Sequence, residues 1–244
     1  MRFQSIAAWG LLWALSCGTS TAGEEIALYV MDVPPMAMHT PDRKGVVGDL
    51  AVEALQRAGY TARIVQEPSN RAMLSVQNGK DALIIPLARV KEREESYTWI
   101  VPAAKVSRAF FALERPANSF AEARNRYKLV AVSRGSAGAN ILRENGFAPD
   151  QIYEVTQGLS APKMLLAGRV DAWFNLVSES RLLLQDSEGH SQVKMGEPLG
   201  ATFNYIACSK NCNPQLVDRL RNAAESMEQD GTAKTIRARY GRLE

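Results

Sequence analysis

Segments with the pattern of a buried strand alternate with segments of helical periodicity along almost the whole chain. The first five segments, in the order strand, helix, strand, helix, strand, cover residues 25–30, 49–58, 62–66, 69–78 and 82–87. Gly59 and Gly79 follow the two helices, at the position where helices commonly end. Strands that alternate with helices form parallel sheets with helices packed on their faces. The alternation therefore predicts an α/β fold with mostly parallel sheets flanked by helices.

The alternation is interrupted by two extended runs, near residues 103–113 and 196–207. A second series of strands and helices lies between them, and a long amphipathic helix starting at Pro214 follows the later one. We therefore expect two lobes joined by two crossing segments. Lobe 1 would hold residues 23–108 and 204–244, and lobe 2 would hold residues 109–203. A single doubly wound domain is the alternative that the pattern leaves open.

The first 22 residues have the features of a secretory signal peptide. Arg2 precedes an apolar run at 6–15, and small residues lead up to Ala22, after which cleavage is expected. The run is too short to span a bilayer, so we expect a signal peptide at 1–22 and a mature protein in the periplasm. Cys17 lies in a poor lipoprotein motif and should leave with the signal. A retained N-terminal anchor is the alternative.

Composition and cysteine content narrow the class of protein. The chain has 244 residues, of which 46% are hydrophobic and 23% charged, with a net charge of +3, as in ordinary globular proteins. No basic tract interleaved with aromatic residues suggests nucleic acid as a partner. Signal cleavage would leave Cys208 and Cys212, which we expect to form a disulfide in an oxidising compartment. With His39 and His190 as the only histidines, we expect no metal site and no cofactor.

The stretch at 79–102 places positive charge directly after an apolar strand. The apolar run at 82–87 is followed by a charged segment at 89–95 and then by a second strand-like run at 97–101. Ligands of open α/β proteins bind at the carboxyl ends of the strands, and an arginine there suits a carboxylate or a phosphate. A solvated turn is the competing interpretation of the charged segment.

Several short motifs occur in a fixed order along the mature chain. They are Pro34-Pro35-Met36, Gly48-Asp49-Leu50-Ala51, Gly79-x-Asp81-Ala82, Glu92-Arg93, Trp99-x-x-Pro102, Val132-x-x-Gly135-Ser136, Gly168-x-x-Asp171-Ala172 and Asp230-Gly231. In this order and spacing the chain resembles the periplasmic solute-binding proteins of ABC importers of the polar-amino-acid type, bacterial extracellular solute-binding family 3. The resemblance implies a two-lobed periplasmic-binding-protein fold of type II, with a two-strand hinge and a ligand held between the lobes.

The resemblance also implies a carboxylate site. Arg93 lies twelve residues after Asp81, where the family has its carboxylate-binding arginine. Gly135, Ser136 and Ala137 match the turn that opens a helix in the second lobe, whose backbone N–H groups can hold the same carboxylate. Ala88 stands where the family usually has threonine or serine.

The partner expected for an α-ammonium group departs from the family pattern. No carboxylate follows the Asp171-Ala172 motif until Glu179, so a standard amino acid is not assured as the ligand. Asp32 could supply the missing charge. Asn70 and Arg71, at a helix start, and Asn175, at a strand end, are further candidates. The predicted ligand-binding residues are Arg93, Arg71, Asn70, Ala88, Gly135, Ser136, Ala137, Asn175 and Asp32.

The resemblance implies a monomeric, non-catalytic receptor for a small carboxylate-bearing solute. Hinge closure would capture the solute, and an ABC permease in the inner membrane would receive it. Two alternatives remain. One is a periplasmic enzyme like the cyclohexadienyl dehydratases, in which Glu179 or Asp32 would act as acid or base. The other is a ligand-sensing module of a signalling system.

Overall fold

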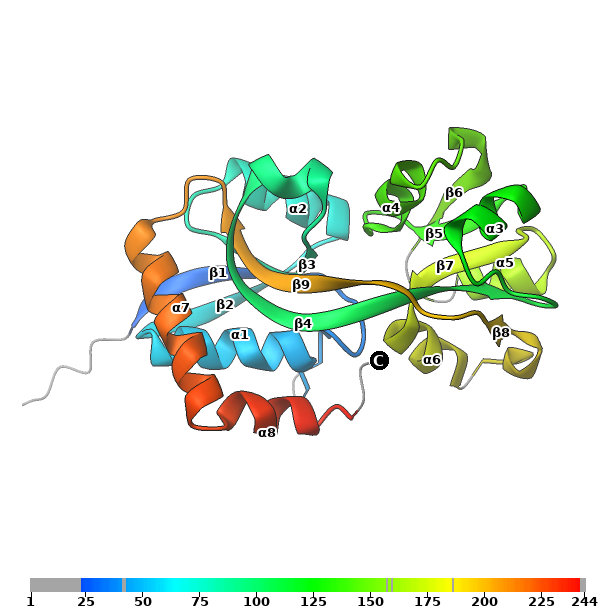
Figure 1. Ribbon diagram of the computed structural model, residues 1–244. Helices are drawn as coiled ribbons and strands as arrows, with labels where there is room; N and C mark the ends of the chain where they lie inside the picture. Colours follow the sequence, from blue (N-terminus) through cyan, green and yellow to red (C-terminus); the bar gives the residue numbers. More distant parts are fainter. Residues whose placement is uncertain (1–22, 41–42, 157, 159, 186, 242–244) are drawn as a thin grey trace, which may run out of the picture.

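Two lobes lie side by side in the computed structural model, connected by two long strands (Figure 1). The structure describes residues 23–40, 43–156, 158, 160–185 and 187–241. The expected signal peptide and Cys17 lie outside this part of the chain. The lobe boundaries, between 108 and 109 and between 203 and 204, stay a prediction.

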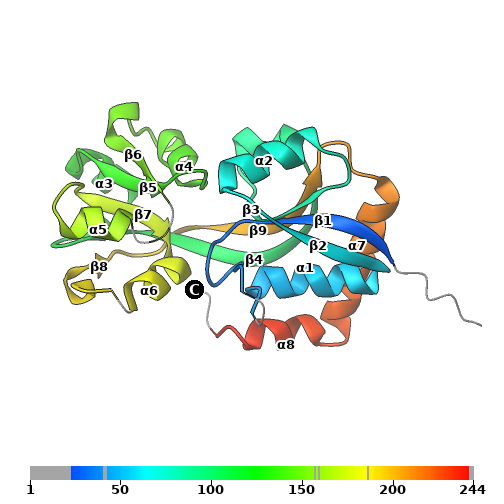
Figure 2. The same cartoon turned by 180° about the vertical axis from the view of Figure 1, so that it is seen from behind.

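The first lobe begins with the predicted alternation. Its elements are β1 (Glu24–Val30), α1 (Val46–Arg57), β2 (Tyr60–Gln66), α2 (Ser69–Asn78), β3 (Leu83–Ala88) and a 3-10 helix (Lys91–Ser96). The chain then crosses in β4 (Tyr97–Ala112) and returns in β9 (Leu199–Ser209), which is followed by α7 (Pro214–Gln229) and α8 (Thr232–Ala238). In Figure 2, seen from behind, α2 lies on one side of the strands and α1, α7 and α8 lie on the other.

The second lobe repeats the same construction between the two crossing strands. Its elements are α3 (Phe120–Arg126), β5 (Val130–Ser133), α4 (Gly138–Glu144), a 3-10 helix (Pro149–Gln151), β6 (Ile152–Val155), α5 (Ser160–Leu166), β7 (Ala172–Leu176), α6 (Val177–Gln185), a 3-10 helix (His190–Gln192) and β8 (Lys194–Met195). Ser119 caps α3: its Oγ accepts a hydrogen bond from the N–H of Glu122 at 3.1 Å.

The described strands form one sheet that runs through both lobes, in the order β2-β1-β3-β9-β4-β7-β5-β6, with β8 beside β4. The pairs β1–β2, β1–β3, β5–β6 and β5–β7 are parallel, whereas β4 and β9 pair antiparallel with each other and with their other neighbours. The prediction of an α/β fold with mostly parallel lobe sheets and a two-strand hinge is confirmed.

Alternation along β3 shows how one strand contributes to two cores. Leu83 and Ile85 belong to the cluster beneath α1 and α7, while Ile84 and Leu87 belong to the cluster beneath α2. Successive side chains of a strand point to opposite faces, so a strand with helices on both sides is apolar throughout. This is the reason that residues 82–87 lack a polar face.

The sequence pattern predicted two separate extended segments on either side of Pro102, but the structure has one continuous strand there. The run at 97–101 and the run at 103–113, except its last residue, belong to one sixteen-residue strand, β4. Pro102 is accommodated because the β4–β9 register shifts on both sides of it, between Trp99 and Val101 and between Pro102 and Ala104. Proline in a sheet is tolerated at such irregularities, where a ladder hydrogen bond is already missing.

Cys208 and Cys212 form the predicted disulfide, at the turn between β9 and α7. Their Cα atoms are 5.9 Å apart. Asn213 begins α7 by accepting a hydrogen bond from the N–H of Gln215 at 2.9 Å, and its own N–H donates to the Asp81 carboxylate. None of the helices in the described residues is both long and apolar enough to cross a membrane.

Candidate functional site

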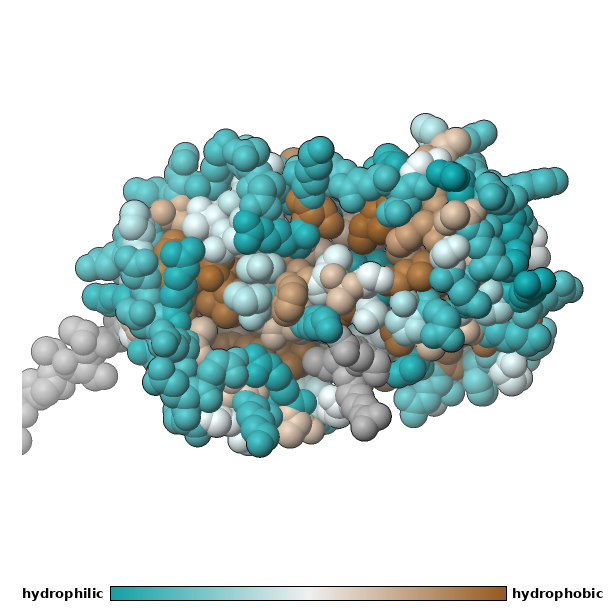
Figure 3. Space-filling view, viewed as in Figure 1, coloured by the Kyte–Doolittle hydropathy of each residue, from teal (hydrophilic) through white to brown (hydrophobic). Residues whose placement is uncertain are grey.

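A pocket lies between the two lobes, and residues from both lobes and from the crossing strands line it. They are Met31, Val33, Pro86, Ala88, Arg93, Arg108, Ser133, Gly135, Ser136, Ala137, Asn175, Leu176, Glu179 and Asn204. On the face seen in Figure 3, hydrophobic residues show near the middle of the molecule, including the region between the lobes, and hydrophilic residues predominate around the rim. The enclosed space is small, about 40 Å³, so the lobes are close together in this structure.

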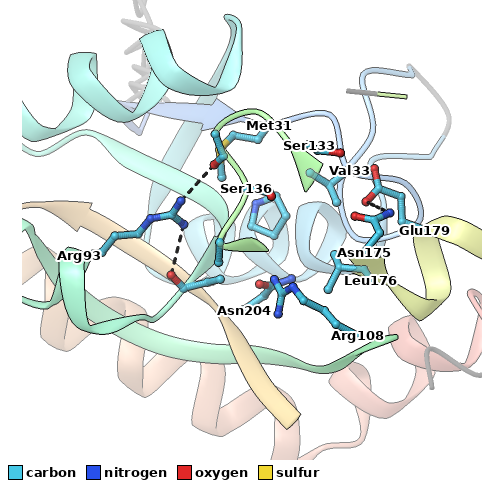
Figure 4. A pocket seen from close by; sticks show the side chains of 14 residues that line it. Met31, Val33, Arg93, Arg108, Ser133, Ser136, Asn175, Leu176, Glu179 and Asn204 are labelled. Atoms are coloured by element: carbon cyan, nitrogen blue, oxygen red, sulfur yellow. Dashed lines mark hydrogen bonds between the residues drawn. The ribbon is translucent and has the colours of Figure 1, made fainter. Parts of the chain in front are cut away.

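Arg93 extends from the 3-10 helix after β3 into this pocket, on one side of it (Figure 4). Only 9% of the residue is exposed. Its Nη2 donates across the pocket to the Gly135 carbonyl at 3.0 Å, and its Nη1 donates to the Ala88 carbonyl at 3.4 Å. Burial lowers the pKa of the guanidinium from its ordinary value. The bond to Gly135 joins the two lobes, and both acceptors of Arg93 are neutral carbonyls. Among the described residues no carboxylate forms an ion pair with Arg93.

Arg108 is a second buried cation, on the crossing strand β4. It is 5% exposed, and its Nη1 donates to Thr202 Oγ1 on β9 at 3.0 Å. Burial, together with the positive charge of Arg93, lowers the pKa of Arg108 to about 10, although the charge of Glu179 opposes the shift. The two guanidinium groups are thus close enough to repel each other in a medium that screens charge poorly.

Glu179 brings a carboxyl group to the opposite side of the pocket, together with Asn175 (Figure 4). Asn175 is the penultimate residue of β7, next to α6, and its Nδ2 donates to Glu179 Oε2 and to Ser180 Oγ, both at 3.1 Å. Glu179 is 4% exposed. Burial raises the pKa of its carboxyl to about 7, although Asn175 and Arg108 both favour the ionised form. This carboxyl can therefore hold or release a proton near neutral pH.

The turn between β5 and α4 supplies the second-lobe wall. Gly135 has φ of 77°, and a Cβ there would lie 2.4 Å from Asn70 Oδ1 of α2. The N–H of Ser136 donates to the Ser133 carbonyl at 3.0 Å, and the N–H of Gly138 donates to Ser136 Oγ at 3.1 Å. Two of the turn's amides are thus satisfied within lobe 2. In this structure the turn presents the carbonyl of Gly135, rather than an amide, to Arg93.

Comparison of the sequence with known protein families identifies the family of this chain. The model of the bacterial extracellular solute-binding proteins, family 3, matches residues 27–242. The chain belongs to this family. A search of curated protein sequences gave no match. In a solute-binding protein of family 3, a pocket between the lobes is the natural candidate for the solute site.

Solved structures share the fold of this family 3 protein over most of its length. A histidine kinase sensor domain similar to periplasmic binding proteins has a TM-score of 0.80 at 17% identity, covering 90% of this chain and 97% of that one. An ancestral arginine-binding protein bound to arginine has a TM-score of 0.77 at 18% identity, covering 91% and 100%. An ancestral amino acid-binding protein described as a precursor of cyclohexadienyl dehydratase has a TM-score of 0.73 at 18% identity, covering 89% and 95%. These similarities confirm the type II fold.

Six of the nine residues predicted from the sequence line the pocket: Arg93, Ala88, Gly135, Ser136, Ala137 and Asn175. The other three lie outside its lining. Asn70 is exposed and contacts the Gly135 turn from lobe 1. Arg71 is exposed on α2, and Asp32 is exposed between two lining residues, near enough for its charge to raise the pKa of Glu179. Residues adjacent in sequence differ in whether they line the pocket, because one side chain faces the pocket and the next faces solvent.

The prediction of site residues omitted two ionisable side chains of the pocket. Arg108 stands in an otherwise largely apolar extended run, and a charge in such a run is the signal that could have identified it. Glu179 was considered only for an enzyme, because it lies beyond the strand end where the family places its acidic residue. Among the described residues, no group of three or more histidine, cysteine, aspartate or glutamate side chains could hold a metal ion.

Proposed function

We propose that this protein is a periplasmic receptor that captures a small carboxylate-bearing solute, an amino acid or a related organic acid. The solute would bind in the pocket between the lobes, and closure of the hinge would retain it. A permease of an ABC importer would then receive it from the closed protein, which acts as a monomer without catalysing a reaction. The proposal is supported by membership of family 3 and by the chemistry of the pocket.

The observation that carries the proposal is the buried guanidinium of Arg93. Removing a charge from water costs several kcal/mol unless an opposite charge or good hydrogen bonds replace the water. Here the acceptors are the neutral carbonyls of Ala88 and Gly135. A solute carboxylate could accept two parallel hydrogen bonds from the same guanidinium, which are about twice as strong as bonds between neutral groups.

Closure follows if both lobes bind one solute. Arg93 reaches the pocket from lobe 1, and Ser136, Ala137 and Asn175 line it from lobe 2. Contacts that exist only in the closed form shift the population toward that form. The solute would therefore couple occupancy of the pocket to the shape that a membrane partner recognises.

A thermal-shift screen of amino acids and dicarboxylates tests the proposal. A solute well above its dissociation constant should stabilise the protein by about 3 to 4 kcal/mol, which appears as a higher melting temperature. We expect Arg93→Ala to abolish the shift. Arg115→Ala removes an exposed arginine outside the pocket lining and should leave the shift intact. A shift of wild-type size in both variants would contradict the assignment of the site.

Glu179 favours a second candidate function, an elimination from a cyclic carboxylate. A buried carboxyl whose pKa is raised to about 7 is suited to general acid or base catalysis at neutral pH. Arg93 would then hold the substrate carboxylate. Incubation with prephenate or arogenate and detection of the product tests this candidate. Turnover that Glu179→Gln abolishes would establish an enzyme, and no turnover by the wild type would eliminate it.

A further inference from the structure

The ionisable side chains that line the pocket carry more positive than negative charge. They are two arginines, Arg93 and Arg108, and one carboxyl group, Glu179, and the other lining residues are neutral. All three are at least nine-tenths buried. Even with Glu179 ionised, one positive charge is left without a counterpart among the lining residues.

Arg108 has no anionic partner in the part of the chain that the structure describes. Its hydrogen-bond partner is the hydroxyl of Thr202, and the Glu179 carboxylate, which attracts it, does not reach ion-pair distance. Glu179 is instead held by the amide of Asn175. A buried guanidinium beside another of the same sign is costly, and an anion placed between them removes that cost.

The two arginines reach the pocket from different elements. Arg93 comes from the 3-10 helix after β3 and Arg108 from the crossing strand β4. Figure 4 shows them at different places around the pocket, with Glu179 and Asn175 on the side opposite Arg93. A single carboxylate held by both hydrogen-bond faces of Arg93 leaves the donors of Arg108 without an anionic acceptor.

We infer that the solute is a dicarboxylic acid, with one carboxylate held by Arg93 and the second by Arg108. This inference rests on the proposed function and names the chemical class of its solute. Arg108 would then select for the second carboxylate, and Asn204 on the neighbouring strand β9 lines the pocket beside the same end. Glu179 and Asn175 would face the middle of the solute. Glu179 would be ionised beside a solute that carries an amino group. It would be protonated beside a solute that has no amino group.

Calorimetric titration of matched pairs tests the inference on the wild-type protein. Glutamate and glutamine, and aspartate and asparagine, differ by one carboxylate at nearly constant shape. Succinate and glutarate carry two carboxylates without an amino group. We expect at least one diacid to bind about tenfold to hundredfold more tightly than its monoamide, since a hydrogen bond to a charged group is worth that much. Binding of succinate or glutarate would show that the amino group is dispensable.

The outcomes separate this inference from the function on which it rests. Binding of a monocarboxylate as tight as that of its diacid, lost in Arg93→Ala, would overturn the inference and leave the receptor function standing. Absence of binding by every acid tested would overturn both.

Variants of Arg108 provide a second measurement. Arg108→Gln should weaken binding of the diacid about tenfold or more and weaken binding of the matched monoamide much less, while Arg108→Lys, which keeps the charge, should retain part of the preference. Arg115→Gln is the control for loss of an arginine outside the pocket. If Arg108→Gln does not fold, the comparison of Arg108→Lys with the wild type replaces it. An unchanged diacid preference in either folded variant overturns the role of Arg108.

Discussion

Burial shifts the pKa of each ionisable side chain that lines the pocket, in a direction set by its charged form. It lowers the pKa of Arg93 and Arg108, whose protonated forms are charged, and raises that of Glu179, whose deprotonated form is charged. Since the pKa of Arg108 remains at about 10, Arg108 stays charged at neutral pH while Glu179, with a pKa of about 7, changes its charge. The pocket is thus more positive at pH 6 than at pH 8.

Glu179 should make the stability of the unliganded protein depend on pH. Between pH 4.5 and about 7 the unfolded chain releases the Glu179 proton while the folded protein retains it. Stability contributed by the protonated form is therefore complete below pH 4.5 and falls by about 3 kcal/mol as the pH rises to 7. Glu179→Gln cannot titrate, so its free energy of unfolding relative to the wild type should rise by about that amount over this range.

Urea unfolding at pH 4.5, 6 and 8 measures this difference. Glu188→Gln, which replaces an exposed glutamate, should follow the wild-type profile. Parallel profiles for Glu179→Gln and the wild type would mean that the Glu179 carboxyl titrates normally in the folded protein.

At the scale of elements, the turn from β5 to α4 depends on one glycine. Gly135 has φ of 77°, in the left-handed region that other residues enter at a cost of about 1 to 2 kcal/mol. Its carbonyl accepts from Arg93, and its Cα faces Asn70 of α2 so closely that a Cβ would displace the Asn70 side chain. The turn is therefore constrained both by its own backbone and by contact with the other lobe.

Gly135→Ala should weaken solute binding as well as stability. Gly168→Ala is a matched control, because Gly168 also has positive φ, at 64°, but nothing lies within 4 Å of a Cβ there. Both variants should lose about 1 to 2 kcal/mol of stability from backbone strain. Only Gly135→Ala should also raise the dissociation constant, by severalfold or more, because closure brings its Cβ against lobe 1. Equal affinities of the two variants in calorimetric titration would contradict a role for Gly135 in closure.

At the scale of the whole molecule, the two lobes share one sheet, so β4 and β9 must bend if the lobes move. Their pairing contains register shifts near Val101, Ala104 and Arg108, where the ladder is already irregular. Arg108 donates a hydrogen bond to Thr202 across these strands and lines the pocket from within the hinge. A solute bound to Arg108 would therefore contact the hinge directly as well as one lobe.

Small-angle X-ray scattering should detect closure of the lobes. Arg93 reaches the pocket from lobe 1, and Ser136, Ala137 and Asn175 line it from lobe 2, so a solute held by both lobes favours the compact form. We expect the radius of gyration to decrease on addition of the solute that gives the largest thermal shift. Arg93→Ala should show no decrease at the same concentration. An unchanged radius for saturated wild-type protein would mean that binding does not move the lobes.

The candidate site could be predicted from the sequence only where a motif has a fixed spacing. Arg93 and the Gly135 turn line the pocket because each follows a strand whose end lies at the cleft. Arg71 follows Asn70 on the first turn of α2, and neither lines the pocket, since the direction of a side chain depends on how the helix is rotated against the sheet. The charge of Arg108 in a largely apolar run makes it a candidate, but the run alone does not decide whether its side chain faces solvent or a pocket.

The local features that the sequence determined depend on residues a few positions apart. Strand and helix periodicity, the glycine ends of helices and the pairing of Cys208 with Cys212 are of this kind. The tertiary structure decided which charges lose their water, because Arg93, Arg108 and Glu179 come from segments far apart in the chain. These side chains are buried only when both lobes and both crossing strands are in place. The electrostatic energy of their shared pocket therefore cannot be read from a local sequence pattern.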